Sequence, residues 1–194
     1  FREERELSVM LLVDLSASQD FGTNLQTKRE LITELGATLA FSAIKNNDKV
    51  GLSLFTDQIE KAIPPRKGKR HVLRLIRELL YCQPMGRGTH LKSALDHLHR
   101  TASQRTVVFL ISDFQDAGFE RTLRITRKKH DVIPIMVNDQ RELDLPNVGL
   151  LRLRDPESGS MITVDTASRR HRDAFSKMQL TEGEKREAMF RRLK

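Results

Sequence analysis

Apolar residues form short continuous runs along this chain, and these runs are separated by segments in which apolar positions recur at helical spacing. Two runs, residues 7–13 (LSVMLLV) and 106–111 (TVVFLI), have the length of a strand and contain a single polar residue each. A strand without polar alternation is typical of a parallel sheet that is buried on both faces. We therefore expect both segments to be central strands.

Helices and further strands alternate with these two runs. Helices are expected at residues 25–46, 72–80, 91–98 and 117–129. Further strands are expected at residues 49–56, 59–63 and 131–137. Pro64-Pro65 should end the second of them, and Pro134 favours a place near the sheet edge for the third. This order predicts an α/β fold: a doubly wound, mostly parallel sheet with helices on both faces.

The C-terminal part of the chain predicts a hairpin followed by a charged helix. Residues 148–153 and 161–164 flank the turn-forming segment 154–159 (RDPESG). The charged helix should be interrupted near Thr181-Glu182-Gly183. With 194 residues in all, we expect one domain at 1–166 and a helical extension at 167–194. A chain that begins with Phe rather than Met is expected to be a piece of a longer protein with an N-terminal region.

Oxygen-bearing side chains follow both predicted central strands. Asp14, Ser16 and Ser18 come directly after the first strand, and Asp113 comes after the second. Thr89 should lie at a helix N-cap, or just beside it, at the same edge of the sheet. Because ligands bind outside the carboxyl ends of parallel strands, these three segments should converge on one crevice. Their oxygens suit Mg²⁺, with Mn²⁺ or Ca²⁺ as substitutes, whereas zinc would prefer His or Cys.

Composition narrows the partners that this chain can have. A net charge of +8 and a pI of about 9.9 are compatible with nucleic acid, an anionic membrane surface or an acidic protein. One Tyr and no Trp provide little for base stacking, so solvated helix faces are favoured over a basic nucleic-acid-binding domain. The single cysteine, Cys82, excludes an internal disulfide and fits a reducing cytosol. No apolar run approaches the roughly 20 residues of a membrane span.

Enzymatic interpretations have less support in the sequence. Neither Ser16 nor Ser18 lies in a Gly-x-Ser-x-Gly elbow, and no Gly-x-x-x-x-Gly-Lys-Ser/Thr loop is present. A Mg²⁺-dependent phosphoryl-transfer or hydrolytic enzyme that uses Asp14 and Asp113 remains the alternative. A second alternative is that these residues serve only in turns, caps and packing.

The segments Asp14-Leu15-Ser16-Ala17-Ser18, Gly88-Thr89 and Ser112-Asp113 together resemble the metal-ion-dependent adhesion site (MIDAS) of von Willebrand factor A domains. The resemblance implies that Ser16, Ser18 and Thr89 bind the metal directly and that Asp14 and Asp113 act mostly through bound water. It also implies a metal with an open coordination position, which binds an Asp or Glu of a partner protein.

A closer resemblance is to the bacterial domain-of-unknown-function family fifty-eight. It is carried by Asp20-Phe21-Gly22-Thr23, Asp48-Lys49-Val50-Gly51-Leu52, Phe55-Thr56-Asp57 and Ile111-Ser112-Asp113-Phe114, and extends to about Asp173. The resemblance implies a partnership with a MoxR-type AAA ATPase or its client. We therefore predict a Mg²⁺-dependent protein-interaction module without catalysis. Its expected location is the cytoplasm, with a tether to the membrane through an N-terminal region, since some members of this family have membrane helices there.

Overall fold

The computed structural model describes residues 6–20, 27–139, 142–154 and 159–193. Along the chain, the N-terminal half contains β1 Ser8–Asp14, the short 3-10 helix η1 Ala17–Asp20, α1 Lys28–Lys45, β2 Lys49–Phe55, β3 Ile59–Arg66 and α2 Lys69–Tyr81. The C-terminal half contains α3 Leu91–Thr101, β4 Val107–Ser112, α4 Glu120–Lys129, β5 Asp131–Met136, β6 Leu150–Arg154, β7 Met161–Asp165 and α5 Arg169–Arg192.

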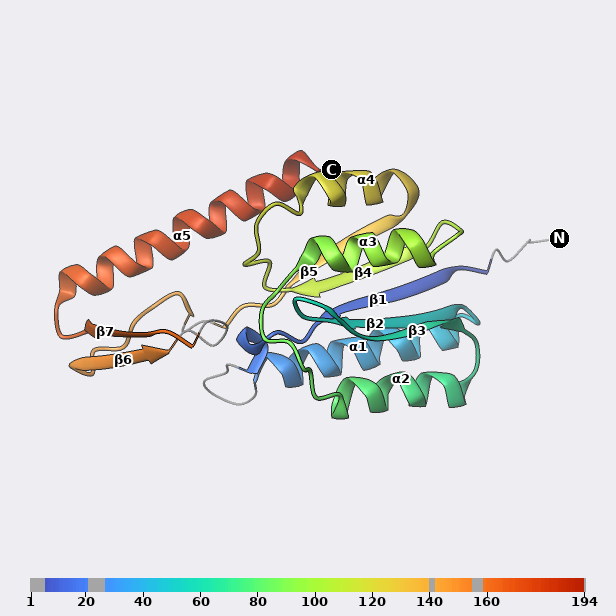
Figure 1. Ribbon diagram of the computed structural model, residues 1–194, viewed down its shortest axis with the longest axis horizontal. Helices are drawn as coiled ribbons and strands as arrows, with labels where there is room; N and C mark the ends of the chain where they lie inside the picture. Colours follow the sequence, from blue (N-terminus) through green and yellow to red (C-terminus); the bar gives the residue numbers. More distant parts are fainter. Residues whose placement is uncertain (1–5, 21–26, 140–141, 155–158, 194) are drawn as a thin grey trace.

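The central sheet has five strands in the order β3-β2-β1-β4-β5 (Figure 1). β1 pairs in parallel with β2 and β4, β4 pairs in parallel with β5, and only the β2–β3 pair is antiparallel. The predicted doubly wound, mostly parallel α/β fold is therefore confirmed, with β1 and β4 in the interior of the sheet. β5 lies at an edge, as Pro134 indicated.

Helices cover both faces of this sheet, with α1 and α2 on one face and α3 and α4 on the other (Figure 1). Ile32, Leu75 and Leu79 pack into one core cluster, and Leu91 and Leu123 pack into the other. The chain passes from β1 to β2 on one side and reaches β4 on the other side of β1. This reversal of strand order places a crevice at the carboxyl ends of β1 and β4.

Two boundaries differ from the sequence prediction. β3 does not end at Pro64-Pro65 but continues to Arg66, because an edge strand tolerates residues that cannot donate to a neighbour. A bulge opposite Gly51 accommodates the prolines: a Cβ at Gly51 would lie 2.9 Å from the carbonyl oxygen of Ile63. α4 begins at Glu120 rather than 117, after Gly118 with its left-handed φ of 80°.

The C-terminal part contains the predicted hairpin, formed by β6 and β7 as a separate antiparallel sheet. Residues 155–158 of its turn lie outside the described residues. The interruption expected near Thr181-Glu182-Gly183 is wrong, since α5 is one continuous helix. Glycine costs about 1 kcal/mol in a helix interior, which the packing of Met189, Phe190 and Leu193 against the core at the end of α5 can offset.

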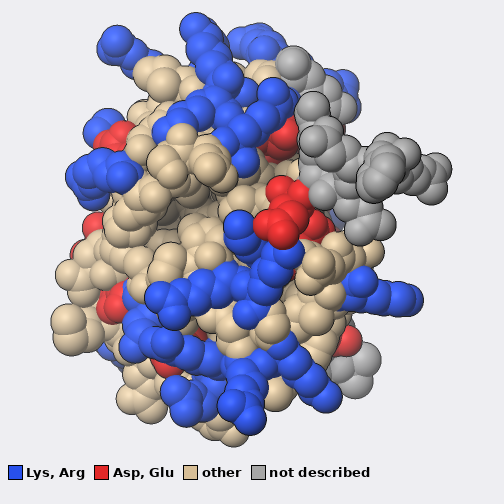
Figure 2. All heavy atoms as spheres, turned by 90° about the vertical axis from the view of Figure 1, so that its right-hand side faces the viewer, with Lys and Arg blue, Asp and Glu red and all other residues tan. Residues whose placement is uncertain are grey.

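Basic side chains gather at the end of the molecule that lies opposite the crevice (Figure 2). The last turns of α1, α3 and α4 point to this end and carry Lys45, Arg100 and residues 127–129. Cations there interact favourably with the partial negative charge of helix C-termini. The C-terminal ends of these helices thus contribute to this basic face. No helix among the described residues combines the length and apolar character that crossing a membrane requires.

Candidate metal centre

The crevice is built where β1 and β4 end side by side. Asp14 is the last residue of β1, Ser112 is the last of β4, and Asp113 follows immediately. Ser112 Oγ donates a hydrogen bond of 2.6 Å to Asp14 Oδ2. All three residues are fully buried, so the two strand ends are fixed to one another by a polar contact that is shielded from water.

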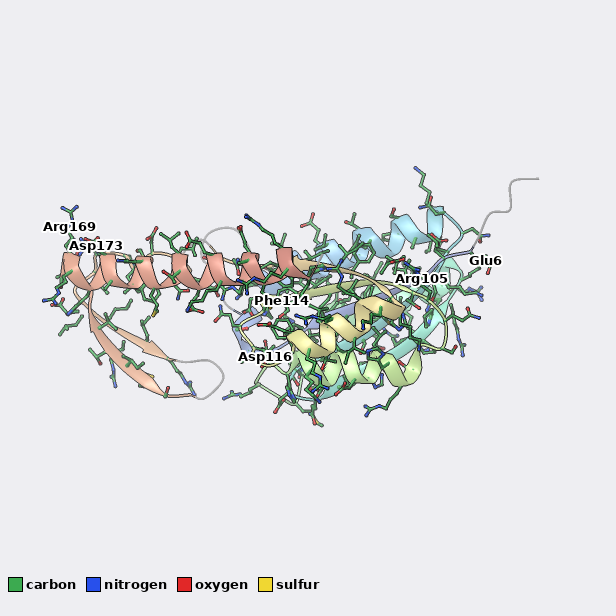
Figure 3. All side chains as sticks on the ribbon, turned by 90° about the horizontal axis from the view of Figure 1, so that it is seen from above. Glu6, Arg105, Phe114, Asp116, Arg169 and Asp173 are labelled. Carbon is green, nitrogen blue, oxygen red and sulfur yellow. The ribbon has the colours of Figure 1, made fainter. Side chains whose placement is uncertain are left out.

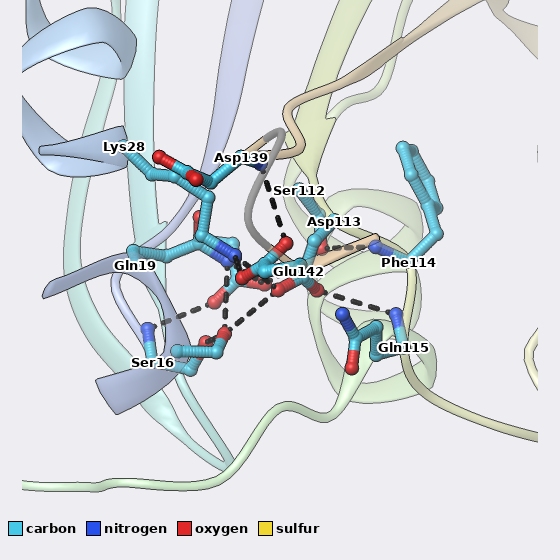
Figure 4. Close-up of polar contacts among 11 residues, drawn as sticks. Ser16, Gln19, Lys28, Ser112, Asp113, Phe114, Gln115, Asp139 and Glu142 are labelled. Carbon is cyan, nitrogen blue, oxygen red and sulfur yellow. Dashed lines mark hydrogen bonds and ion pairs between the residues drawn. The ribbon is translucent and has the colours of Figure 1, made fainter. Parts of the chain in front are cut away.

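The loop after β1 turns back on Asp14. Ser16 N donates to Asp14 Oδ1 over 2.8 Å, a local contact by which an aspartate stabilises a turn. Ser16 Oγ and Ser18 Oγ lie 3.0 Å apart, and Ser18 Oγ donates to Asp113 Oδ2 over 2.9 Å (Figure 4). The structure therefore brings four of the predicted site residues into one hydrogen-bonded network.

The fifth predicted residue, Thr89, lies in the loop between α2 and α3. The N-cap of α3 is the next residue, His90, so the expected place just beside the cap is confirmed. Two backbone hydrogen bonds hold the loop at the crevice: His90 N donates to Thr56 O over 3.0 Å, and Ala17 N donates to Arg87 O over 2.9 Å. Thr89 thus comes from a segment that is bonded to the Asp14–Ser18 loop.

Phe114 shapes the loop that carries Asp113. Its φ of 56° is left-handed, a conformation that costs a residue with a Cβ roughly 1–2 kcal/mol. The buried Phe114 lies beside the C-terminal end of α5 (Figure 3). Its ring meets the Phe190 ring edge-on, with 4.9 Å between the two ring centroids. Asp113 Oδ1 then accepts from Gln115 N over 3.2 Å. Aromatic packing therefore maintains a strained turn that aims Asp113 at the crevice.

Three crevice residues were not predicted. Gln19 is fully buried, and its Nε2 donates to Ser18 Oγ over 3.1 Å. Lys28 is 3% exposed, and its Nζ lies 3.1 Å from Asp113 Oδ2 and 2.7 Å from Glu142 Oε1. A signal existed for Lys28, because it precedes the buried Ile32 by four residues and so belongs to the buried stripe of α1. Nothing local to the sequence marks Glu142.

The electrostatics of the crevice fit a divalent cation. Burial raises the pKa of Asp14 to about 6, and the charge of Asp113 adds to this rise, while hydrogen bonds from Ser112 and Ser16 oppose it. Three carboxylates and the Lys28 ammonium leave negative charge in excess. Gln19 Oε1 is buried and receives no donor from the described residues. An ion that carries bound water would supply both the missing charge and the missing donor.

The chemistry of the donors limits the kind of ion that could bind in the crevice. No group of three or more His, Cys, Asp or Glu suited to a metal occurs among the described residues. The crevice instead combines two buried carboxylates with serine hydroxyls and an amide oxygen. Oxygen donors alone suit Mg²⁺, Mn²⁺ or Ca²⁺.

A family model described as "Protein of unknown function DUF58" matches residues 1–185. The chain belongs to the DUF58 family. Its fold is the doubly wound, mostly parallel α/β fold, of the von Willebrand factor A type, that its sequence motifs indicated.

Curated relatives of this DUF58 chain come from mycobacteria. Over 171 residues it is 33% identical to "Uncharacterized protein Rv1480" of Mycobacterium tuberculosis (strain ATCC 25618 / H37Rv), which covers 86% of this chain and 54% of that protein. Over 120 residues it is 32% identical to "Uncharacterized protein MAV169" of Mycobacterium avium, which covers 59% of this chain and 69% of that one. The chain thus spans about half the length of Rv1480.

Solved structures share the fold at low sequence identity. An aerotolerance-related membrane protein from Bacteroides fragilis superposes with a TM-score of 0.63 at 18% identity, covering 88% of this chain and 84% of that one. BatB from Bacteroides thetaiotaomicron superposes with a TM-score of 0.62 at 18% sequence identity, and the match covers 88% of this chain and 85% of BatB. Proximal thread matrix protein 1 from the mussel byssus was solved with a zinc-occupied MIDAS motif. It superposes with a TM-score of 0.54 at 16% sequence identity, and the match covers 68% of this chain and 38% of that one.

Proposed function

We propose that this DUF58 domain is a protein-interaction module that holds a divalent cation, Mg²⁺ first, in the crevice and captures an Asp or Glu side chain of a partner protein. The observation that carries the proposal is the network joining the ends of β1 and β4, in which Asp14, Ser16, Ser18 and Asp113 share short hydrogen bonds. A crystal structure of a protein with a similar fold was solved with zinc in its MIDAS motif, which supports an ion here.

Each residue of the network has a role in this proposal. Ser16, Ser18 and Thr89 would hold the ion through their hydroxyls, and Asp14 and Asp113 would anchor its water. Few charged oxygens in direct contact leave the ion electrophilic, so that it can accept a carboxylate from outside. Ser112 keeps Asp14 in place through its 2.6 Å hydrogen bond, and the Phe114 turn does the same for Asp113.

The partner follows from the resemblance of the family motifs rather than from the crevice alone. We propose a MoxR-type AAA ATPase or its client as the source of the carboxylate, and a module without catalysis of its own. The cytoplasm is the proposed location, with a tether to the membrane through an N-terminal region. That the Bacteroides fragilis protein of similar fold is described as a membrane protein supports such a tether.

The Asp14→Ala variant tests the metal role. Residues that orient metal ligands typically contribute 10- to 100-fold in affinity, so we expect Mn²⁺ affinity to fall by about 100-fold, and capture of the ATPase to be lost with it. Circular dichroism checks that the fold persists. Asp96→Ala, which removes a partly exposed carboxylate of α3 that pairs with Lys92, is the matched control. Capture of the partner by Asp14→Ala, or by the wild type in chelator, would refute the mechanism.

The Lys28 ammonium beside two carboxylates favours one other function, a Mg²⁺-dependent phosphoryl-transfer enzyme. Against it stands the burial of Asp14, whose oxygens already accept hydrogen bonds from Ser16 N and Ser112 Oγ. Hydrolysis of a phosphate ester such as para-nitrophenyl phosphate separates the two functions. Turnover that the Asp14→Ala variant lacks would establish the enzyme, whereas the interaction module predicts no turnover.

A further inference from the structure

The crevice contains a positively charged side chain, the ammonium of Lys28. We infer that this ammonium binds the Asp or Glu side chain of the partner, and that Glu142 takes the place of that side chain in the free protein. This inference rests on the proposed function, because it assigns the acidic group of the partner to a second contact beside the ion. It makes Lys28 a specificity-determining residue and Glu142 an internal competitor of the partner.

Lys28 is delivered to the crevice with little freedom. It is the first residue of α1, and the preceding Thr27 forms a capping box with Glu30 that fixes where the helix starts. The Lys28 side chain is 2% exposed. A buried ammonium is costly unless it is paired, and here two carboxylates pair with it (Figure 4).

The two carboxylates that contact Lys28 are held very differently. Asp113 is fully buried and is fixed by Ser18 Oγ and Gln115 N. The Glu142 side chain is 21% exposed and lies between β5 and β6, where its Oε2 accepts a longer hydrogen bond of 3.3 Å from Asp139 N. Glu142 is therefore the carboxylate that can leave Lys28 toward solvent.

Exchange of Glu142 for an outside carboxylate preserves the charge balance of the crevice. Lys28 keeps two anionic partners, Asp113 stays paired, and the released Glu142 gains water. A neutral amide in the same position would leave the buried ammonium with one anionic partner fewer. Because an imperfectly paired buried charge is strongly disfavoured, the crevice should accept Asp or Glu and reject Asn or Gln.

The test uses two variants and a defined probe. The probe is the peptide acetyl-Gly-Asp-Gly-amide, and its control is the same peptide with Asn in place of Asp. Binding to the full chain in saturating Mg²⁺ is measured by NMR, from the backbone amide signals of Ser16 and Gln115. Glu142→Gln frees Lys28 from its competitor, so the Asp peptide should bind about tenfold more tightly, since apparent affinity scales with the fraction of the competent state. Lys45→Met and Glu184→Gln, both exposed, should change nothing.

Lys28→Met keeps the aliphatic stem and removes the charge. It should lower the preference for the Asp over the Asn peptide by about tenfold, while Mn²⁺ affinity stays equal or rises because a neighbouring cation has been removed. Glu142→Gln is a substitution at a partly exposed position, so it tests the inference even where Lys28→Met fails to fold.

The outcomes separate the inference from the proposed function. Asp-peptide affinities equal to wild type in both variants would overturn the carboxylate site and leave Lys28 with a structural role, whether or not the ion binds. An Asp peptide that binds in chelator and still responds to Glu142→Gln would refute the metal mechanism but support the Lys28 site. An Asp peptide that neither the wild type nor Glu142→Gln binds, although Mn²⁺ does bind, would overturn both the Lys28 site and the capture of a carboxylate by the ion, and would leave metal binding alone.

Discussion

Asp14 illustrates a residue whose burial opposes folding. It is fully buried at the end of β1, and burial raises its pKa from 3.8 to about 6. The hydrogen bonds from Ser112 Oγ and Ser16 N reduce this rise without removing it. An ion bound in the crevice would favour the charged form of Asp14, so without it the carboxylate destabilises the native state.

We predict that Asp14→Asn stabilises the metal-free protein at pH 7.5. The native state binds a proton at Asp14 more tightly than the unfolded chain does, so the penalty is full above about pH 6 and disappears as the pH falls below 3.8. The gain should be on the order of 2 kcal/mol at pH 7.5 and should vanish near pH 4. Urea unfolding in chelator at both pH values measures it.

Asp173→Asn, an exposed carboxylate of α5, is the control for the Asp14 substitution and should leave the free energy of unfolding unchanged at both pH values. An Asp14→Asn protein that is less stable than wild type in chelator at pH 7.5 would contradict the electrostatic argument. The hydrogen bonds of Asp14 would then outweigh the burial of its charge.

The sequence predicts those site residues whose place follows from a strand end. Asp14, Ser16, Ser18 and Asp113 come directly after apolar runs, and parallel pairing alone brings the ends of those runs together. Glu142 is different, because its contact with Lys28 depends on the path of the loop after β5. No periodicity or spacing encodes such a path.

Elements were predicted well where periodicity decides, and poorly where tertiary packing outweighs local preference. The buried runs gave β1 and β4, and Pro134 gave an edge strand. Pro64-Pro65 did not end β3, because the edge position and the bulge accommodate both prolines. Gly183 did not interrupt α5. In both cases the sequence contains residues that disfavour the element, but their energetic cost is smaller than the stabilisation from the contacts of the whole strand or helix.

α5 has its C-terminal turn anchored close to the crevice, through the edge-on contact of Phe190 with Phe114. We predict that Phe190→Ala lowers the free energy of unfolding by about 1–3 kcal/mol, since it removes a partly buried ring and an aromatic pair. It should also weaken Mn²⁺ affinity, because the strained Phe114 turn beside Asp113 loses its support. Urea unfolding and Mn²⁺ titration measure the two effects.

Met178→Ala, on an exposed part of the same helix, is the matched control for Phe190→Ala and should alter neither quantity. Loss of stability with unchanged Mn²⁺ affinity would show that the Phe114 turn keeps its shape without α5.

On the scale of the whole molecule, the basic end bears on how a partner associates with the domain. Basic side chains cover the end opposite the crevice (Figure 2), where Glu6 pairs with Lys49 and Lys67, and Arg105 pairs with Asp131. A net charge of +8 would attract an acidic partner over long range, while the proposed recognition of one carboxylate would take place in the crevice. Long-range attraction accelerates association more than it strengthens a complex.

The whole fold should lose stability in mild acid through His130. This residue is 1% exposed, and neither of its ring nitrogens has a hydrogen-bond partner among the described residues. Burial lowers its pKa, the charges of Lys129 and His99 lower it further, and Asp131 opposes them. As the pH falls through 6.5, His130 is protonated in the unfolded chain but stays neutral in the native protein, so the free energy of unfolding decreases.

We therefore predict that His130→Phe flattens the loss of stability of the metal-free protein between pH 7.5 and 5.5, relative to wild type. His171→Gln, at an exposed position, should keep the slope of wild type. Urea unfolding at several pH values in chelator measures these slopes. Asp14 has the opposite effect, because its raised pKa makes its burial cost less as the pH falls. Asp14→Asn should therefore make the loss of stability in acid steeper, whereas His130→Phe should make it shallower. Equal slopes for wild type and His130→Phe would assign the acid sensitivity to other groups.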